Sequence, residues 1–354
     1  MAKKVIVVGA GIVGASLAYH LAKAGASVTV IDALAKPGGV ATPNTWGWIN
    51  ASWFNPEPYA KLRMRAMEMW RTLSSMTDLK VNWCGSLLWD VPADELRAFE
   101  KQHSAWGYKI QLLDRAGIAR IEPALKEPPE IVAYASGEGV IEPGAAVAGF
   151  MNAAISLGVT VINSQQVTGF EMRGGCVVGV KTDAGFMGAD EVVIAAGVGS
   201  LELLKTIGLA LPLKPSAALV VYSAATAKLL NTMLIAPGME LRQDASGKII
   251  IATDLADGQS HDEQALSEIQ KIRSTLRGAE NLQLERFAIG HRPMPQDGFP
   301  LVGRMPSAQG LYVAVTHSGI TLAPAIGAFG ADEILNDHRH ELLAPYNPDR
   351  MIAS

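Results

Sequence analysis

The residues whose spacing first suggests chemistry are three glycines near the amino terminus. Gly9, Gly11 and Gly14 fit the pattern G-x-G-x-x-G, and Asp32 follows at the distance of about 20 residues typical of dinucleotide-binding motifs. In such motifs the glycines allow a tight turn, close approach of the backbone to a pyrophosphate, and close packing of the next helix. The Asp32 carboxylate would accept hydrogen bonds from ribose hydroxyls and would repel the 2′-phosphate of NADP. These residues predict dinucleotide binding without separating FAD from NAD.

The elements that must position this motif are visible in the surrounding hydrophobic pattern. Residues 5–8 form a β-branched run typical of a buried parallel strand. Apolar and small residues then recur at helical spacing over 13–24, and residues 27–31 return to a strand pattern. The backbone N–H groups of Ile12 and Val13, at the positive end of this helix, would hold the diphosphate. We expect a β-α-β unit with parallel neighbouring strands.

The composition indicates a large globular chain and argues against several classes of protein. Its 354 residues exceed what one hydrophobic core usually organises, and 49% hydrophobic against 18% charged residues leaves little room for disorder. A net charge of −4 argues against a nucleic-acid partner. Cys84 and Cys176 are too few for a disulfide framework, so we expect a reducing, cytoplasmic location. Glycines and His20 interrupt the apolar run near the start, and we expect no transmembrane segment.

The rest of the chain alternates between helical and strand-like patterns. Residues 167–172 and 177–182 predict a hairpin with a glycine turn. Asp262 is expected to cap an amphipathic helix that has Leu266 on its apolar face, and the last helix is expected to begin at about Pro324. The other segments with a clear pattern are strands over 159–163, 191–195, 218–222, 248–253 and 311–315, and helices over 58–76, 145–157 and 324–336.

Several motifs, taken in chain order, resemble the D-amino-acid oxidase superfamily of FAD-dependent oxidoreductases, in particular its glycine oxidase and sarcosine oxidase members. The resemblance begins with the glycine motif and the hairpin. It continues through residues 192–197, 290–293 and 297–303, and ends with the flavin-contacting run at 316–324. These motifs extend from one end of the chain to the other, so the resemblance covers essentially the whole protein.

The resemblance implies an α/β fold in which a discontinuous, Rossmann-like FAD-binding domain is joined to a substrate domain. The FAD-binding domain would comprise residues 1–82, 138–212 and 291–354. Residues 83–137 and 213–290 would form the substrate domain, with a mixed, largely antiparallel sheet and flanking helices.

The activity implied by the resemblance is oxidation of the C–N bond of a small amine or amino acid. A hydride would pass to flavin N5, and the resulting imine would hydrolyse. The FAD would be non-covalent, because neither cysteine lies in the carboxy-terminal flavin loop and no histidine lies within 41–50. Oxygen or an unknown carrier would accept the electrons. Two alternatives stay open: a flavin-binding subunit of a heteromeric amine dehydrogenase, and an NAD-linked dehydrogenase.

The resemblance also assigns roles to individual residues. Arg292 would clamp a substrate carboxylate through two parallel hydrogen bonds, unless it merely pairs with Asp297 across a turn. His317 would supply a proton or a hydrogen bond, or would be a structural loop residue. The remaining contacts to the cofactor would come from Val167, Ala196, Gly197, Ser318, Gly319, Ile320 and Thr321.

The substrate pocket is expected to include Trp48, Tyr222 and Glu240. Glu240 stands where relatives often have a carboxylate-binding tyrosine, so it would disfavour a simple carboxylate and attract a cationic group. No cluster of side chains predicts a metal site, and the histidines in residues 338–340 are interpreted as part of a solvated end.

Overall fold

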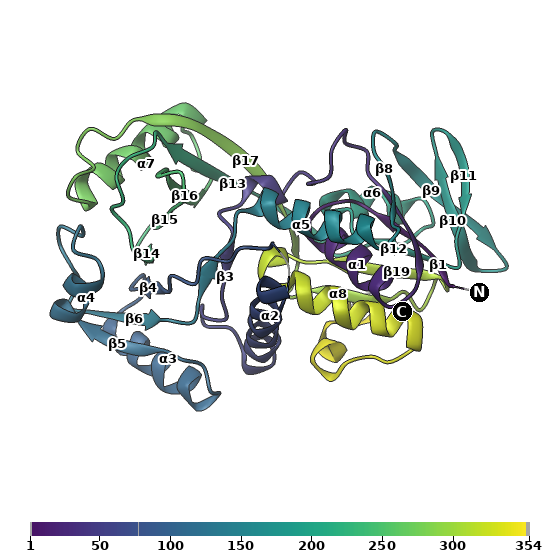
Figure 1. Cartoon of the computed structure of the whole chain (residues 1–354), viewed down its shortest axis with the longest axis horizontal. Helices are drawn as coiled ribbons and strands as arrows, with labels where there is room; N and C mark the ends of the chain where they lie inside the picture. The colour runs from purple at the N-terminus through teal and green to yellow at the C-terminus, as the bar shows by residue number, and fades with distance from the viewer. Residues whose placement is uncertain (1, 77, 352–354) are drawn as a thin grey trace.

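The computed structural model describes residues 2–76 and 78–351, and these fold around two large sheets that occupy the two sides of the molecule (Figure 1). The sheet on the right of the figure has the order β18-β19-β12-β1-β2-β8 and is parallel except at β18. Its strands are β1 (Lys4–Val8), β2 (Ser27–Ile31), β8 (Thr160–Ile162), β12 (Glu191–Ile194), β18 (Leu301–Arg304) and β19 (Leu311–Val315). The expected β-α-β unit is confirmed, with β1 and β2 as parallel neighbours.

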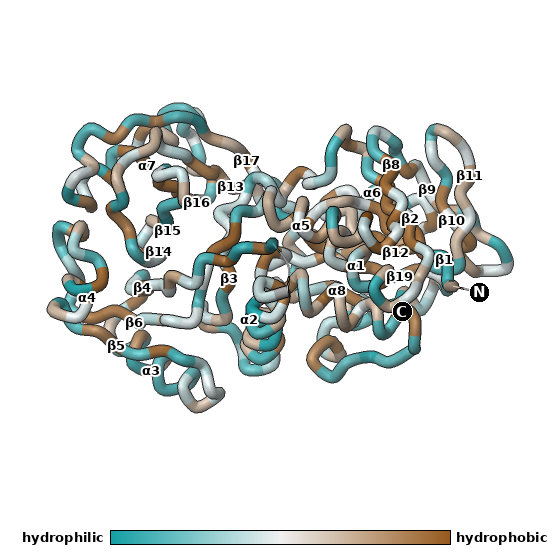
Figure 2. Tube along the Cα trace, in the orientation of Figure 1, coloured by the Kyte–Doolittle hydropathy of each residue, from teal (hydrophilic) through white to brown (hydrophobic). Residues whose placement is uncertain are grey.

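Both faces of this sheet are covered, which explains why its strands are apolar throughout. Val5 and Val7 belong to the core under α1, α5 and α8, whereas Ile6 and Val8 belong to the core under the β9-β10-β11 sheet. Figure 2 shows the hydrophobic residues concentrated along β12 and β19 in the middle of this lobe. The covering elements are α1 (Ile12–Lys23), α2 (Glu57–Met76), α5 (Pro143–Ser156), α8 (Gly319–Asn336), β9 (Val167–Arg173), β10 (Cys176–Thr182), β11 (Gly185–Gly188) and α6 (Ser200–Lys205).

The second sheet has the order β17-β13-β16-β15-β14-β4-β6-β5 and is antiparallel except between β14 and β4. The expected mixed, largely antiparallel sheet with flanking helices is thus confirmed. Its strands are β4 (Ser86–Leu88), β5 (Gln111–Asp114), β6 (Ile131–Ala135), β13 (Leu213–Ser223), β14 (Met233–Ala236), β15 (Met239–Gln243), β16 (Ile249–Asp254) and β17 (Leu284–Pro295). The helices beside it are α3 (Ala93–Ala105), α4 (Arg115–Ile121) and α7 (His261–Thr275).

The two sheets are joined by segments that cross between them. A short pair, β3 (Trp48–Ile49) with β7 (Gly139–Val140), lies in this connecting region (Figure 1). Strand β17 pairs with β13 as far as Pro295, so the domain boundary expected after residue 290 falls inside a strand. Short 3-10 helices cover Thr42–Asn44, Gly197–Gly199, Glu341–Tyr346 and Pro348–Met351. Within residues 2–76 and 78–351, no helix has the length and apolar character needed to cross a bilayer.

The start of the last helix differs from the sequence-based expectation. Helix α8 begins at Gly319, and Pro324 lies inside it. A proline lacks the N–H that would bond to the carbonyl four residues earlier, here that of Ile320. The buried indole of Trp70 on α2 supplies this bond instead, with Nε1 2.9 Å from the Ile320 oxygen. A tertiary contact therefore allows the helix to begin one turn earlier than the proline suggests.

Two other expectations are wrong in detail. Helix α7 is capped by Ser260, not by Asp262, through a capping box in which the Ser260 and Glu263 side chains each accept from the other residue's N–H. Leu266 is 54% exposed, because Ala265 occupies the buried face in its place.

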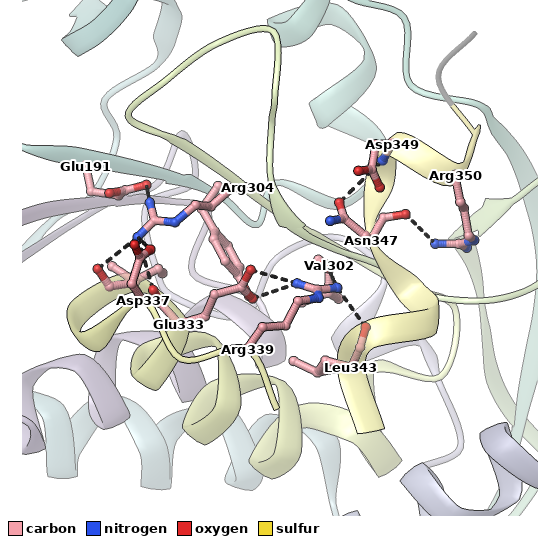
Figure 3. A network of polar contacts seen from close by, with 12 residues as sticks. Glu191, Val302, Arg304, Glu333, Asp337, Arg339, Leu343, Asn347, Asp349 and Arg350 are labelled. Atoms are coloured by element: carbon pink, nitrogen blue, oxygen red, sulfur yellow. Dashed lines mark hydrogen bonds and ion pairs between the residues drawn. The ribbon is translucent and has the colours of Figure 1, made fainter. Parts of the chain in front are cut away.

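The interpretation of residues 338–340 as a solvated end holds for His338, whose side chain is 67% exposed, but is wrong for Arg339 and His340. Arg339 donates to both carboxylate oxygens of Glu333 at 2.7 Å and to the carbonyls of Val302 and Leu343 (Figure 3). His340 stacks on Phe329 with ring centroids 3.7 Å apart. The segment after α8 is therefore anchored to β18 and helps to fix the helix at its carboxyl end.

Candidate active site

One continuous cavity of about 1460 Å³ runs from the carboxyl ends of β1 and β2 to the second sheet. Crevices at the carboxyl ends of parallel strands are the usual ligand sites of such sheets. The volume exceeds the roughly 300–1,000 Å³ of common ligand pockets. The cavity therefore has room for a dinucleotide at one end and a small substrate at the other.

The glycine motif forms the first wall of this cavity. A Cβ added at Gly9, which has φ +102°, would lie 2.6 Å from the Ala195 oxygen, and one at Gly14 would lie 1.9 Å from the Gly9 oxygen. Gly14 packs against Gly9 and Ala195 and does not line the cavity. At Gly11 the nearest atom to such a Cβ is Thr42 Oγ1 at 3.5 Å, so the cavity side of this residue is open for a ligand.

The start of α1 faces the same space. Gly11 is the N-cap and forms no side-chain cap, and Ile12 and Val13 line the cavity. The Ile12 N–H makes a long bond of 3.3 Å to Thr42 Oγ1. This end of the helix, with its positive dipole, fits the diphosphate of a dinucleotide.

Asp32 lies at the end of β2, where the sequence predicts it, but it has an additional structural role. Its carboxylate is 7% exposed and accepts from the N–H groups of Ala10 at 2.6 Å and Leu34 at 2.8 Å. These bonds tie the glycine turn to the segment after β2. Asp32 still lines the cavity, so a ribose hydroxyl would share oxygens that already hold the loop.

The other residues expected to contact the cofactor come together along the cavity. Val167 opens β9, and Ala196 and Gly197 follow β12. Ser318 caps the start of α8, and Thr321 Oγ1 in its first turn donates to the Trp48 carbonyl at 3.1 Å. The cavity lining contains Val167, Ala196, Gly197, Ser318, Gly319, Ile320 and Thr321.

His317 also lines the cavity, directly before the α8 N-cap. Burial, and then the positive charges of Arg292 and Arg63, lower its pKa to about 4. The imidazole is therefore neutral at pH 7. It can give or accept a hydrogen bond, but it carries no charge there.

Arg292 projects into the cavity from β17. Its guanidinium donates to Ser216 Oγ at 2.8 Å and forms an ion pair with Asp254. The alternative pairing with Asp297 is wrong, because Asp297 pairs with Arg350 at 2.9 Å. Arg292 thus already has an anionic partner, although the Asp254 side chain is largely exposed.

Of the expected pocket residues, Trp48 and Glu240 line the cavity and Tyr222 does not. The residues of β13 that line the cavity are Ala218 and Val220, and Tyr222 follows them on the same strand. Its ring is covered by the Arg286 guanidinium, whose carbon is 3.5 Å from the ring centroid.

Glu240 is a second group of the cavity lining, besides His317, whose pKa is strongly shifted. Burial, and then the nearby Asp90, raise the pKa of its carboxyl to about 7, and Arg292 opposes this shift. Burial also raises the pKa of Asp90, which lines the cavity close by. Within the described part of the chain, Glu240 forms no ion pair with Arg292 or any other cation. The same residues contain no group of three or more side chains suited to a metal ion.

Four charged residues of the cavity lining were missed from the sequence: Arg63 on α2, Asp90 after β4, Glu202 on α6 and Asp254 at the end of β16. A signal existed for Arg63. It precedes the buried Met67 and Trp70 by four and seven positions, so it stands on the apolar face of the helix. Asp90 and Asp254 occupy loop-like contexts with no comparable pattern.

Comparison with known proteins gives consistent matches over most of the chain. The family model described as "DAO: FAD dependent oxidoreductase" matches residues 4–333. A glycine oxidase from Pseudomonas putida is 27% identical over 99% of both chains, and the uncharacterized oxidoreductase YurR from Bacillus subtilis is 29% identical over 99% of this chain and 100% of that one. The structure of L-proline dehydrogenase from P. horikoshii has a TM-score of 0.90 at 24% identity, covering 99% of this chain and 97% of the other, which shows the same fold. The chain belongs to the DAO family of FAD-dependent oxidoreductases, as the sequence resemblance predicted, and its cofactor is FAD.

Proposed function

We propose that the chain oxidises the C–N bond of a small amine or amino acid, with FAD bound non-covalently in the cavity. The supporting observation is the continuity of the cavity, which joins Gly11 to the charged wall at Arg292 and Glu240. Relatives named glycine oxidase and D-amino acid dehydrogenase, the latter from Rhizobium rhizogenes, support an amine donor. Bound FAD would supply the acceptor for a hydride lost from the carbon beside the amine, and the resulting imine would hydrolyse.

The side chains of the substrate half then have distinct roles. Hydride loss requires a neutral amine, and Glu240, with its pKa near 7, takes a proton from the substrate ammonium. His317 contributes a hydrogen bond in its neutral form. Arg292 holds a substrate carboxylate in competition with Asp254. Because Asp90 lines the same space as Glu240, amines with a second cationic group bind better than simple amino acids.

The test is anaerobic mixing of the purified protein with a panel of amino acids, simple amines and diamines, followed by visible absorbance. Yellow protein that is bleached by a panel member supports the proposal. Yellow protein that no amine bleaches, even with an artificial acceptor, indicates instead a flavin subunit that depends on a partner. Colourless protein that reduces NAD indicates the NAD-linked alternative. Re-oxidation of the bleached protein by air or only by an added carrier then identifies the acceptor.

A further inference from the structure

Arg63 is a buried cation of the cavity wall that has no acidic partner among residues 2–76 and 78–351. It is 6% exposed and lines the cavity from α2. Its Nε donates to the Asn50 carbonyl at 2.9 Å, its Nη2 to the Asn50 side-chain oxygen, and its Nη1 to Ser318 Oγ at 2.7 Å and to the Tyr59 hydroxyl at 3.4 Å. All these acceptors are neutral. Across the described ranges, no carboxylate forms an ion pair with Arg63.

Glu138, a buried carboxylate that accepts a hydrogen bond from the cavity residue Trp48, is engaged by other donors. Its oxygens accept four hydrogen bonds, and it is fully buried. The donors are Trp48 Nε1 at 2.9 Å, the Ser52 N–H at 3.1 Å, Ser86 Oγ at 2.5 Å and the Tyr108 hydroxyl. Among the described residues, Glu138 forms no hydrogen bond or ion pair with the Arg63 guanidinium.

An unpaired buried charge is expensive, and neutral hydrogen bonds orient it without cancelling it. The four bonds hold the guanidinium rigidly, and the second Nη2 hydrogen has no acceptor among the described residues. Such an arrangement is retained where an anion arrives from outside the protein, because the anion then completes the pairing.

The position of Arg63 indicates which anion this is. Ser318, its partner at 2.7 Å, is the N-cap of α8, so the guanidinium charge adds to the positive end of that helix. His317 beside it is neutral and contributes no charge. We infer that Arg63 supplies a fixed positive charge that favours the reduced, negatively charged form of FAD over the oxidised form. Charge near the flavin ring is one of the means by which a protein tunes this cofactor.

This inference rests on the proposed function, because it requires the flavin ring to lie at the start of α8. Its test is the two-electron reduction potential, measured by anaerobic equilibration of the holoprotein with a reference dye. In Arg63→Gln, the affinity for reduced relative to oxidised FAD is expected to fall about tenfold, which lowers the potential by about 30 mV. Arg65→Gln is the matched control, since it removes the same charge from a half-exposed residue of the same helix that pairs with Glu68.

Two further variants separate charge from local structure. Arg63→Lys keeps the charge and is expected to stay close to the wild-type potential, although it loses the bonds to Asn50. Ser318→Asp places a carboxylate beside the guanidinium and is expected to lower the potential, whereas the neutral Ser318→Asn is not.

The inference is overturned if Arg63→Gln and Arg65→Gln have the same potential, or if Arg63→Lys falls as far as Arg63→Gln. A substrate carboxylate as the partner would appear as weaker substrate binding at an unchanged potential, which also overturns it. If Arg63→Gln does not hold FAD, the comparison of Ser318→Asp with Ser318→Asn provides the test. Equal reduction potentials of these two variants would overturn the inference. The measurement uses no amine, so a failed substrate panel refutes the proposed function without affecting this result.

Discussion

At the scale of the residue, the substrate half of the cavity is governed by charges that are only partly compensated. Arg292 has Asp254 as its partner, while Glu240 and Asp90 line the same cavity and neither forms an ion pair within the described residues. Burial penalises the charged form of each carboxyl and so raises the pKa of both Glu240 and Asp90. Neighbouring charges then add to that penalty or oppose it. We therefore expect distinct, measurable effects when Arg292 or Glu240 is replaced.

Replacement of Arg292 by alanine should weaken the binding of substrates that carry a carboxylate and leave FAD binding unchanged. We expect a loss of roughly 1.5–3 kcal/mol in binding, the usual range for hydrogen bonds to charged groups. Titration of the holoprotein with carboxylate-bearing and carboxylate-free amines measures this. Arg286→Ala is the control, because Arg286 lies on the same strand over Tyr222, away from the cavity lining. Equal affinity of Arg292→Ala and wild type for carboxylates would remove Arg292 from its proposed role.

Glu240 should make the stability of the protein depend on pH. Between pH 4.5 and about 7 the unfolded chain releases the proton that the folded chain still holds, so the unfolding free energy falls as pH rises through this window. The total fall should be roughly 2–3 kcal/mol. In Glu240→Gln it should disappear. Urea unfolding of the FAD-free protein at both ends of the window checks this, with the exposed Glu57→Gln as control. An unchanged pH profile in Glu240→Gln would exclude the buried, proton-holding state.

At the scale of the element, α8 shows how one tertiary hydrogen bond extends a helix. The first turn of α8 contains Gly319 and Thr321 and forms part of the cavity wall. Pro324, one turn later, has no N–H to donate to the Ile320 carbonyl. The indole of Trp70 compensates from α2. The position of the proposed flavin contacts therefore depends on a side chain that lies far away in the sequence.

Loss of this indole donor should destabilise the protein. Trp70→Phe leaves the Ile320 carbonyl without its partner, and we expect a loss of roughly 1–3 kcal/mol in unfolding free energy. Adding Pro324→Ala restores an N–H in the helix and should recover part of that loss. Pro324→Ala alone should have a smaller effect. A double-mutant cycle by urea denaturation measures the coupling, and purely additive effects would contradict the compensation.

At the scale of the whole molecule, the cavity is lined by residues of both sheets, so ligands that fill it would contact both sides of the molecule in Figure 1. Strand β17 runs along this junction and carries Arg292 near its end. A ligand that binds only the folded state stabilises it by mass action.

Addition of FAD to the FAD-free protein should therefore raise the unfolding free energy, by about 2.7 kcal/mol at a hundredfold excess over Kd. Thermal unfolding followed by circular dichroism measures this effect. NADP is the control and should give no stabilisation, because its 2′-phosphate would meet the Asp32 carboxylate. An equal shift with both nucleotides would contradict the assignment of this crevice to FAD.

The sequence by itself determined the local elements and the motif they carry. The strand at 5–8, the glycine turn, the helix after it and the hairpin at β9 and β10 follow from patterns within a few residues, and each is confirmed. These signals are reliable because turn geometry and helical periodicity depend on neighbouring residues. The order of the motifs along the chain then identified the family.

Only the tertiary structure decided which charges face one another. Arg63, Asp90 and Asp254 meet the cavity from α2, from the end of β4 and from β16, whereas Tyr222 lies outside it and Arg339 is anchored instead of solvated. Their placement depends on how the two sheets pack together. Packing is set by contacts between segments that are distant in the chain, and the spacing of residues within one segment carries no record of those contacts.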